Sequence, residues 1–159
     1  MLERTARHVV FNGGDPSETE LAVLHLIAHA LELTLKAVLR REGRSARELR
    51  YPPFGHDLAY MWKLAEVEFL RQRVPEIAAH VVMDARHAGR WTDLPEGDPG
   101  ALFFEQLPLL SELHSADSDF ALRYPTSGNR LKPGAPFLVD VIRCLIAVAE
   151  RAQVARQRP

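Results

Sequence analysis

Cysteine is nearly absent from this sequence, which contains one, Cys144, in 159 residues. A single cysteine excludes an intrachain disulfide framework and a zinc site built from several thiolates. The sequence also lacks an excess of charge of one sign, because 20 Lys and Arg residues are matched by 21 Asp and Glu residues. The total charge therefore does not indicate a nucleic-acid or membrane partner, and any such affinity would have to come from a local patch.

Long apolar runs are missing as well. No stretch approaches about 18 uninterrupted apolar residues, and the N-terminal stretch "MLERTARHVVFNGG" lacks the apolar segment of a signal peptide. We therefore expect a cytoplasmic protein with no membrane partner. The residues that are present, 47% hydrophobic and 26% charged, fit one globular domain over residues 1–159.

The clearest pattern is a long amphipathic helix that follows Ser17. Ser17 and Glu20 have the spacing of a capping box, and Gly43 is a suitable end. Apolar residues between these signals recur at steps of three and four, which predicts one buried stripe. The stripe consists of Leu21, Leu24, Ala28, Leu31, Leu35 and Val38, widened by Val23, Ile27, Ala30 and Ala37.

Further helices are predicted where apolar residues again share one side, over 56–73, 75–90, 101–114 and 137–156. Pro108 predicts a kink or a boundary inside one of them. Prolines and glycines predict a loop over 91–100 and an irregular connection over 115–136, and residues 1–16 are read as an N-terminal arm. The sequence thus predicts an all-α fold, an antiparallel up-and-down bundle of four to five helices.

Three stretches together resemble the HEPN domain, a family of helical bundles: "HALELTLKAVL" in the first helix, "FGHDL" opening the second, and "LRYP" ahead of the last. The resemblance covers most of the chain. It implies a homodimer, as found in toxin-antitoxin modules with a nucleotidyltransferase partner and in defence ribonucleases that act on RNA. The family's ribonuclease signature is an arginine followed several residues later by a histidine near the final helix. The last helix here contains Arg143, Arg151 and Arg156 but no histidine, so that site is missing from its expected position.

Arg50 and His56 match the spacing of this signature elsewhere in the chain. In a ribonuclease the arginine would hold a phosphate and the histidine would transfer a proton. A Pro-Pro step and Gly55 separate the two residues, which places them on a bent loop and not on one helical face. We favour a structural interpretation, in which Asp57 caps the following helix and Gly55 permits the turn.

A polar row runs along the first helix, where His25, His29, Glu32 and Lys36 recur at steps of four, three and four. Two histidines four residues apart and a glutamate can ligate zinc from one helix face, which is one hypothesis. We favour a scaffold role, because Glu32 and Lys36 have the spacing of a helix ion pair. This pair would pack against the turn at His56 and tie the first loop to the long helix.

Arginines are concentrated in "RREGRSARELR", which includes Arg44 and Arg47. They could bind RNA phosphates or a phosphorylated small molecule, although we favour a solvated helix end that opposes the negative pole of the helix dipole. The resemblance makes Arg123 and Tyr124 scaffold residues over the end of the bundle, with Arg123 able to pair with Asp57. A substrate-binding role for this arginine is the alternative.

The favoured function is that of a HEPN-like bundle that acts as a dimerising interaction or regulatory module and binds RNA or a nucleotide, with no cofactor. One alternative is a metal-independent endoribonuclease that uses Arg50 and His56. The second is a metal-binding bundle that uses His25, His29 and Glu32.

Overall fold

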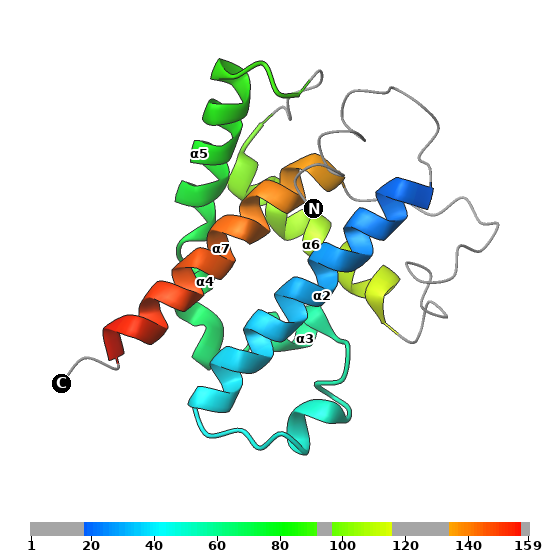
Figure 1. Cartoon of the computed structure of the whole chain (residues 1–159), viewed down its shortest axis with the longest axis vertical. Coiled ribbons are helices and arrows are strands. Elements are labelled where there is room, and N and C mark those ends of the chain that lie inside the picture. The colour runs from blue at the N-terminus through cyan, green and yellow to red at the C-terminus, as the bar shows by residue number, and fades with distance from the viewer. Residues whose placement is uncertain (1–17, 92–96, 116–133, 157–159) are drawn as a thin grey trace.

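The computed structural model of this chain describes residues 18–91, 97–115 and 134–156. Within these ranges every regular element is a helix, which confirms the predicted all-α fold. The elements are α2 (Glu18–Arg41), η1 (Glu48–Arg50), α3 (Leu58–Trp62), η2 (Ala65–Val67), α4 (Glu68–Arg71), α5 (Val74–His87), α6 (Pro99–His114) and α7 (Ala135–Arg156), where η marks a short 3-10 helix (Figure 1). The predicted capping serine Ser17 lies outside the described residues.

The two longest helices, α2 and α7, pack against each other and run in the same direction (Figure 1). Helix α6 contacts α2, α3 and α5, and α5 also contacts α7. An antiparallel order was predicted for the bundle, and the pair formed by α2 and α7 departs from it. Helix α3 contacts both α2 and α6, which also contact each other. The N-terminal turn of α3 therefore lies beside both helices.

The buried stripe of α2 is largely as predicted. Five of its six residues are buried and Leu21 is partly buried: the buried ones are Leu24, Ala28, Leu31, Leu35 and Val38. The expectation for Ala37 is wrong, because this residue is exposed. At about 100° per residue, Ala37 lies roughly 200° from Leu35, so it points to the opposite side of the helix, and Leu39 is buried in its place.

The single helix predicted over 56–73 is also wrong, because the chain forms α3, η2 and α4 in succession. The break falls at Leu64, whose backbone is extended with a ψ of 148°. Arg71 donates from Nη1 to the carbonyl oxygen of Leu64 at 2.9 Å and to that of Trp62. The arginine thus supplies hydrogen bonds to two carbonyl groups at the interruption, and the Leu64 carbonyl also accepts the backbone N–H of Val67 at 3.1 Å.

Helix α6 starts earlier than expected and continues through Pro108. Asp98 forms its N-cap, since Oδ1 accepts the Gly100 backbone N–H at 2.8 Å, and Pro99 occupies the first turn, where a proline is favourable. The predicted loop therefore ends two residues early, and its residues 92–96 lie outside the described part of the chain. Proline has no backbone N–H, so one helical hydrogen bond is missing at Pro108. Because Pro108 is exposed, this gap is on the solvent side of α6.

By length and composition, α2 could cross a membrane, and it is the one helix of which this holds within the described ranges. Core helices of soluble proteins meet the same criterion. Leu24, Leu31 and Leu35 of α2 are fully buried against the other helices, so α2 is a core helix of this fold.

Candidate functional site

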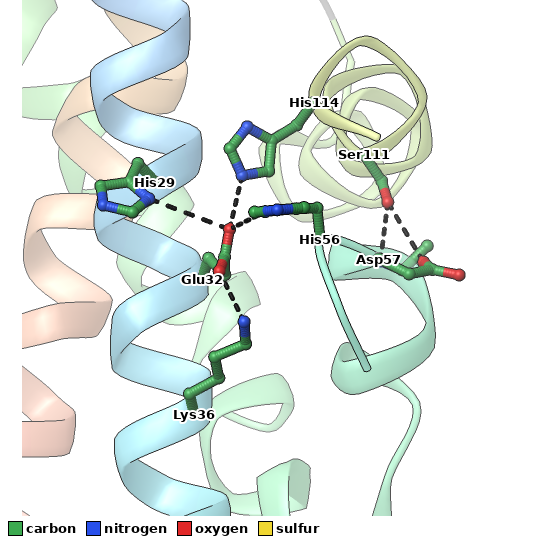
Figure 2. A network of polar contacts seen from close by, with 8 residues as sticks. His29, Glu32, Lys36, His56, Asp57, Ser111 and His114 are labelled. Atoms are coloured by element: carbon green, nitrogen blue, oxygen red, sulfur yellow. Dashed lines mark hydrogen bonds and ion pairs between the residues drawn. The ribbon is translucent and has the colours of Figure 1, made fainter. Parts of the chain in front are cut away.

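The candidate site is a polar cluster around the carboxylate of Glu32, on the side of α2 that faces α3 and α6 (Figure 2). The side chain of Glu32 is only 4% exposed, which is unusual for a glutamate. A buried carboxylate has to be paired and hydrogen-bonded to persist in a folded protein. The partners of Glu32 therefore define the site.

Both carboxylate oxygens of Glu32 accept hydrogen bonds. Lys36 donates from Nζ to Oε1 at 2.6 Å, while His114 Nε2 and His56 Nδ1 lie 2.7 and 2.9 Å from Oε2. Because an ionised carboxylate only accepts, each of these two ring nitrogens carries the hydrogen. His29 Nδ1 lies 3.9 Å from the same oxygen, beyond hydrogen-bond reach.

These contacts decide the charge of Glu32. Burial alone would raise the pKa of the carboxyl group, since it disfavours the charged form. The hydrogen bonds from His114, Lys36 and His56 outweigh burial and hold the pKa of Glu32 well below its ordinary value. The cluster therefore contains a fixed negative charge at neutral pH, with Lys36 as its nearest cation.

The turn ahead of α3 places His56 against Glu32. Gly55 has a positive φ of 29°, which suits glycine, and Asp57 caps α3 by accepting the Tyr60 backbone N–H at 2.8 Å. Both the capping role of Asp57 and the packing of the Glu32–Lys36 pair against this turn are confirmed.

A buried serine attaches the same turn to α6. Ser111 Oγ accepts the backbone N–H of Ala59 at 2.9 Å and lies 3.3 Å from Asp57 Oδ1 (Figure 2). Ser111 is 4% exposed, whereas Asp57 is exposed, so the two contacts reach from the core to the surface of the turn. Since His114 lies one turn further along α6, the end of this helix holds the turn and the carboxylate together.

Four of the six histidine rings within the described residues gather at this place. The ring of His114 lies 5.8 Å from that of His25, 6.4 Å from that of His29 and 5.5 Å from that of His56, measured between centroids. His114 is buried, whereas the side chains of His29 and His56 are 46% and 37% exposed. The cluster is thus closed on the core side and open to solvent at two rings.

Sequence reasoning missed His114 and Ser111. His114 is 82 residues from Glu32 and ends a helix whose other residues are mostly apolar, so no local spacing links the two. The predicted metal set was His25, His29 and Glu32. Among the described residues, the group whose ligand atoms all lie within 4.8 Å of one another is His29, Glu32 and His114, so His114 takes the place that was assigned to His25.

Arg50, the predicted catalytic partner of His56, is exposed and ends η1. The ring of His56 is held by Glu32. The group that holds this ring is thus a carboxylate on α2, and the catalytic pairing of His56 with Arg50 stays a prediction.

Most of the arginine-rich segment is exposed, as expected of a solvated helix end, and Arg44 is the arginine in it that packs against other residues. Arg44 pairs with Glu66 at 3.0 Å and its guanidinium lies 5.6 Å from the ring centroid of Phe54. Ser45 and Glu48 bond to each other reciprocally in the turn that leads into η1: the Ser45 backbone N–H donates to Glu48 Oε2 at 2.6 Å, and the Glu48 backbone N–H donates to Ser45 Oγ at 3.1 Å. Arg44 is thus used for packing, while Arg47 remains exposed.

Arg123 and Tyr124 lie outside the described residues, so their predicted roles stay predictions. Asp57, the proposed partner of Arg123, is engaged with Tyr60 and Ser111. Cys144 is half-buried on α7, and burial raises the pKa of its thiol, as expected for a thiol beside the core.

Fold and site together define the chain as an all-α helical bundle with a histidine-rich centre built on one buried glutamate. No protein-family model, curated protein or solved structure matches it. The resemblance to HEPN domains therefore stays a prediction.

Proposed function

We propose that this chain is an interaction or regulatory module that pairs with a second copy of itself through α2. The observation that carries the proposal is an exposed apolar stripe on a helix whose other side forms the core. Leu26 is 45% exposed and Leu33 is 54% exposed, and they lie seven residues apart, two turns along one face.

Small residues extend the stripe in both directions. Ala22 and Ala37 are exposed on the same face, and Ala30 between the two leucines is partly buried. Alanines beside leucines leave room for the leucines of a facing helix, so the stripe can pack against another copy about a two-fold axis. A two-fold axis perpendicular to α2 makes the two helices antiparallel.

Charge at the two ends of α2 favours this antiparallel arrangement. Acidic Glu20 lies in the first turn of the helix, and basic Arg40 and Arg41 lie in its last turn. Antiparallel pairing brings the acidic start of one helix alongside the basic end of the other, and it opposes the two helix dipoles. The homodimer that the HEPN resemblance implies would use this face, and RNA, a nucleotide or a nucleotidyltransferase would be its regulatory partner.

The test is the molar mass of the protein in solution by size-exclusion chromatography with light scattering. We expect wild type at about twice the chain mass of 17.9 kDa, and the double variant Leu26→Glu/Leu33→Glu at the mass of one chain with unchanged helical circular dichroism. Met83→Glu is the matched control, since Met83 is 55% exposed on α5. A monomeric wild type at high concentration, or an equal effect of the control, contradicts the proposal.

A second candidate is a metal-independent endoribonuclease, which the pairing of His56 with Glu32 favours. A carboxylate that fixes one ring nitrogen of a half-exposed histidine is the arrangement of an oriented general base. Arg50, ahead of it on η1, would hold the phosphate.

Incubation with RNA in EDTA separates this candidate from the first. An endoribonuclease loses cleavage in Arg50→Ala and in His56→Ala while both remain folded, and it keeps cleavage in the control Arg47→Ala. Absence of cleavage by wild type, or equal cleavage by the His56 variant, rules the candidate out.

A further inference from the structure

We propose that His29, Glu32 and His114 bind one divalent transition-metal ion of the zinc class. This site goes beyond the proposed function, since it involves neither the leucine stripe nor RNA. Its ligand atoms all lie within 4.8 Å of one another, on two helices that are distant in sequence (Figure 2).

The spacing of the ligand atoms fits such an ion. Ligands bonded to tetrahedral zinc at about 2.0 Å lie roughly 3.3 Å apart. Here the ring nitrogens of His114 and His29 lie 2.7 and 3.9 Å from Glu32 Oε2, on either side of that value. An ion among the three atoms would widen the first separation and shorten the second by about half an ångström each, which side-chain rotation can supply. A nitrogen that binds a metal must present a lone pair, so the hydrogen that His114 Nε2 donates to Glu32 would leave that atom, and the neutral ring would carry its hydrogen on Nδ1 instead.

His29 provides an independent indication. Its Nδ1 atom is shielded from water and has no hydrogen-bond partner, although the other edge of the ring reaches solvent. A buried polar atom without a partner costs about 1–3 kcal/mol and requires an explanation. A metal ion between Nδ1 and the Glu32 carboxylate would give this nitrogen a partner.

The donor set selects the kind of ion. Two imidazoles and one carboxylate suit zinc, cobalt, nickel or copper, whereas magnesium and calcium prefer oxygen ligands throughout. Two ligands come from one turn of α2 and the third from the end of α6, which leaves a fourth position on the solvent side, where His29 is half-exposed. Three protein ligands with an open position are typical of reactive zinc sites.

Two neighbouring groups contact Glu32 without binding the ion. His56 donates from Nδ1 to Glu32 Oε2 and so orients the carboxylate, as residues around metal ligands commonly do. Lys36 neutralises the charge at Oε1, and its ammonium would repel a cation at the other oxygen. Removal of that ammonium should therefore tighten metal binding.

The experiment is a titration of tag-free, EDTA-treated protein with zinc chloride by calorimetry and with cobalt chloride by visible absorption. We expect one ion per chain, a cobalt spectrum typical of low-coordinate nitrogen and oxygen ligands, and a rise in melting temperature with zinc by mass action. We expect His29→Ala to bind at least about tenfold more weakly, because even loss of a supporting residue costs that much. Lys36→Met is expected to bind several-fold more tightly.

His80→Ala is the matched control, because His80 is 71% exposed on α5 and lies 3.3 Å from Asp84, a surface pair that could hold zinc adventitiously. Its affinity should equal that of wild type. Failure to bind one ion per chain, equal loss in the control, or no gain in Lys36→Met overturns the proposal. His29 carries the test because it is half-exposed, whereas His114→Ala would disturb the core. None of these results changes the dimer mass that tests the proposed function.

Discussion

Replacement of Glu32 by glutamine is the sharpest test of how the polar cluster is held together. The two side chains have nearly the same shape, so Glu32→Gln leaves the packing of α2 intact and changes only charge and hydrogen bonding. The carboxylate accepts from Lys36 on one oxygen and from His114 and His56 on the other. A glutamine amide has one accepting oxygen, so one of these two sides faces an N–H2 group that cannot accept.

The expected loss follows from these contacts. A hydrogen bond to a charged group contributes about 1.5–3 kcal/mol, and breaking a buried ion pair costs about 3–5 kcal/mol. Lys36 is 20% exposed, so water recovers part of the cost of its lost partner. We therefore expect Glu32→Gln to lower the free energy of unfolding by about 2–3 kcal/mol, less than a fully buried pair would.

The assay is urea unfolding followed by circular dichroism, in EDTA at pH 7. Glu76→Gln is the control, because Glu76 pairs with Arg73 at the surface and is 67% exposed. We expect it to change the free energy of unfolding by less than about 0.5 kcal/mol. A loss below about 1 kcal/mol for Glu32→Gln, or a loss equal to the control's, would refute the reasoning.

The pH dependence of this loss has a definite sign. The pKa of Glu32 in the folded protein lies below its ordinary value of 4.5. Its contribution to stability is therefore present above that value and is lost as the pH falls below it. The difference between wild type and Glu32→Gln should narrow as unfolding is measured at decreasing pH below 4.5, and a difference that widened there would contradict the assignment.

Three further predictions concern Asp57, Ser111 and Cys144. Asp57→Ala removes the N-cap of α3 and should cost about 1 kcal/mol in urea unfolding. Ser111→Ala leaves the Ala59 N–H without its acceptor and should cost about 1–2 kcal/mol, and the two losses should not add, because Ser111 also contacts Asp57. The Cys144 thiol, whose pKa is raised by burial, should react with iodoacetamide more slowly than a free cysteine until urea unfolds the chain; an equal rate in the native protein would show that the thiol is open to solvent.

Local patterns predicted much of the fold. The apolar repeats predicted the buried faces of α2 and α5: on α5, Ile77, Val81 and Ala85 recur at a step of four and are buried. The break between α3 and α4 could not be predicted in the same way. The apolar residues there keep a helical spacing, and the segment contains no glycine or proline that would indicate a break. Arg71 stabilises that break from α4, seven residues beyond Leu64, and a side-chain contact to a backbone carbonyl leaves no trace in the apolar pattern.

In the candidate site, too, local spacing predicted some residues and tertiary packing supplied the others. The Glu32–Lys36 pair and its contact with His56 follow from spacing on one helix and from the adjoining turn. His114 and Ser111 come from α6, whose position against α2 depends on the packing of the whole core. Sequence alone therefore predicted three of the four rings, those of His25, His29 and His56, and could not predict His114, which closes the cluster.

The convergence of three chain segments on one oxygen atom also affects how the molecule can open. His56 and His114 are 24 and 82 residues away from Glu32, yet both bind the same Oε2. If the end of α6 detaches, the Glu32 carboxylate loses its hydrogen bond from His114 and becomes exposed to water. In the same event the turn before α3 loses its hydrogen bond to Ser111. Local unfolding of these two regions is therefore coupled, and amide hydrogens in the first turn of α3 and the last turn of α6 should exchange at similar rates.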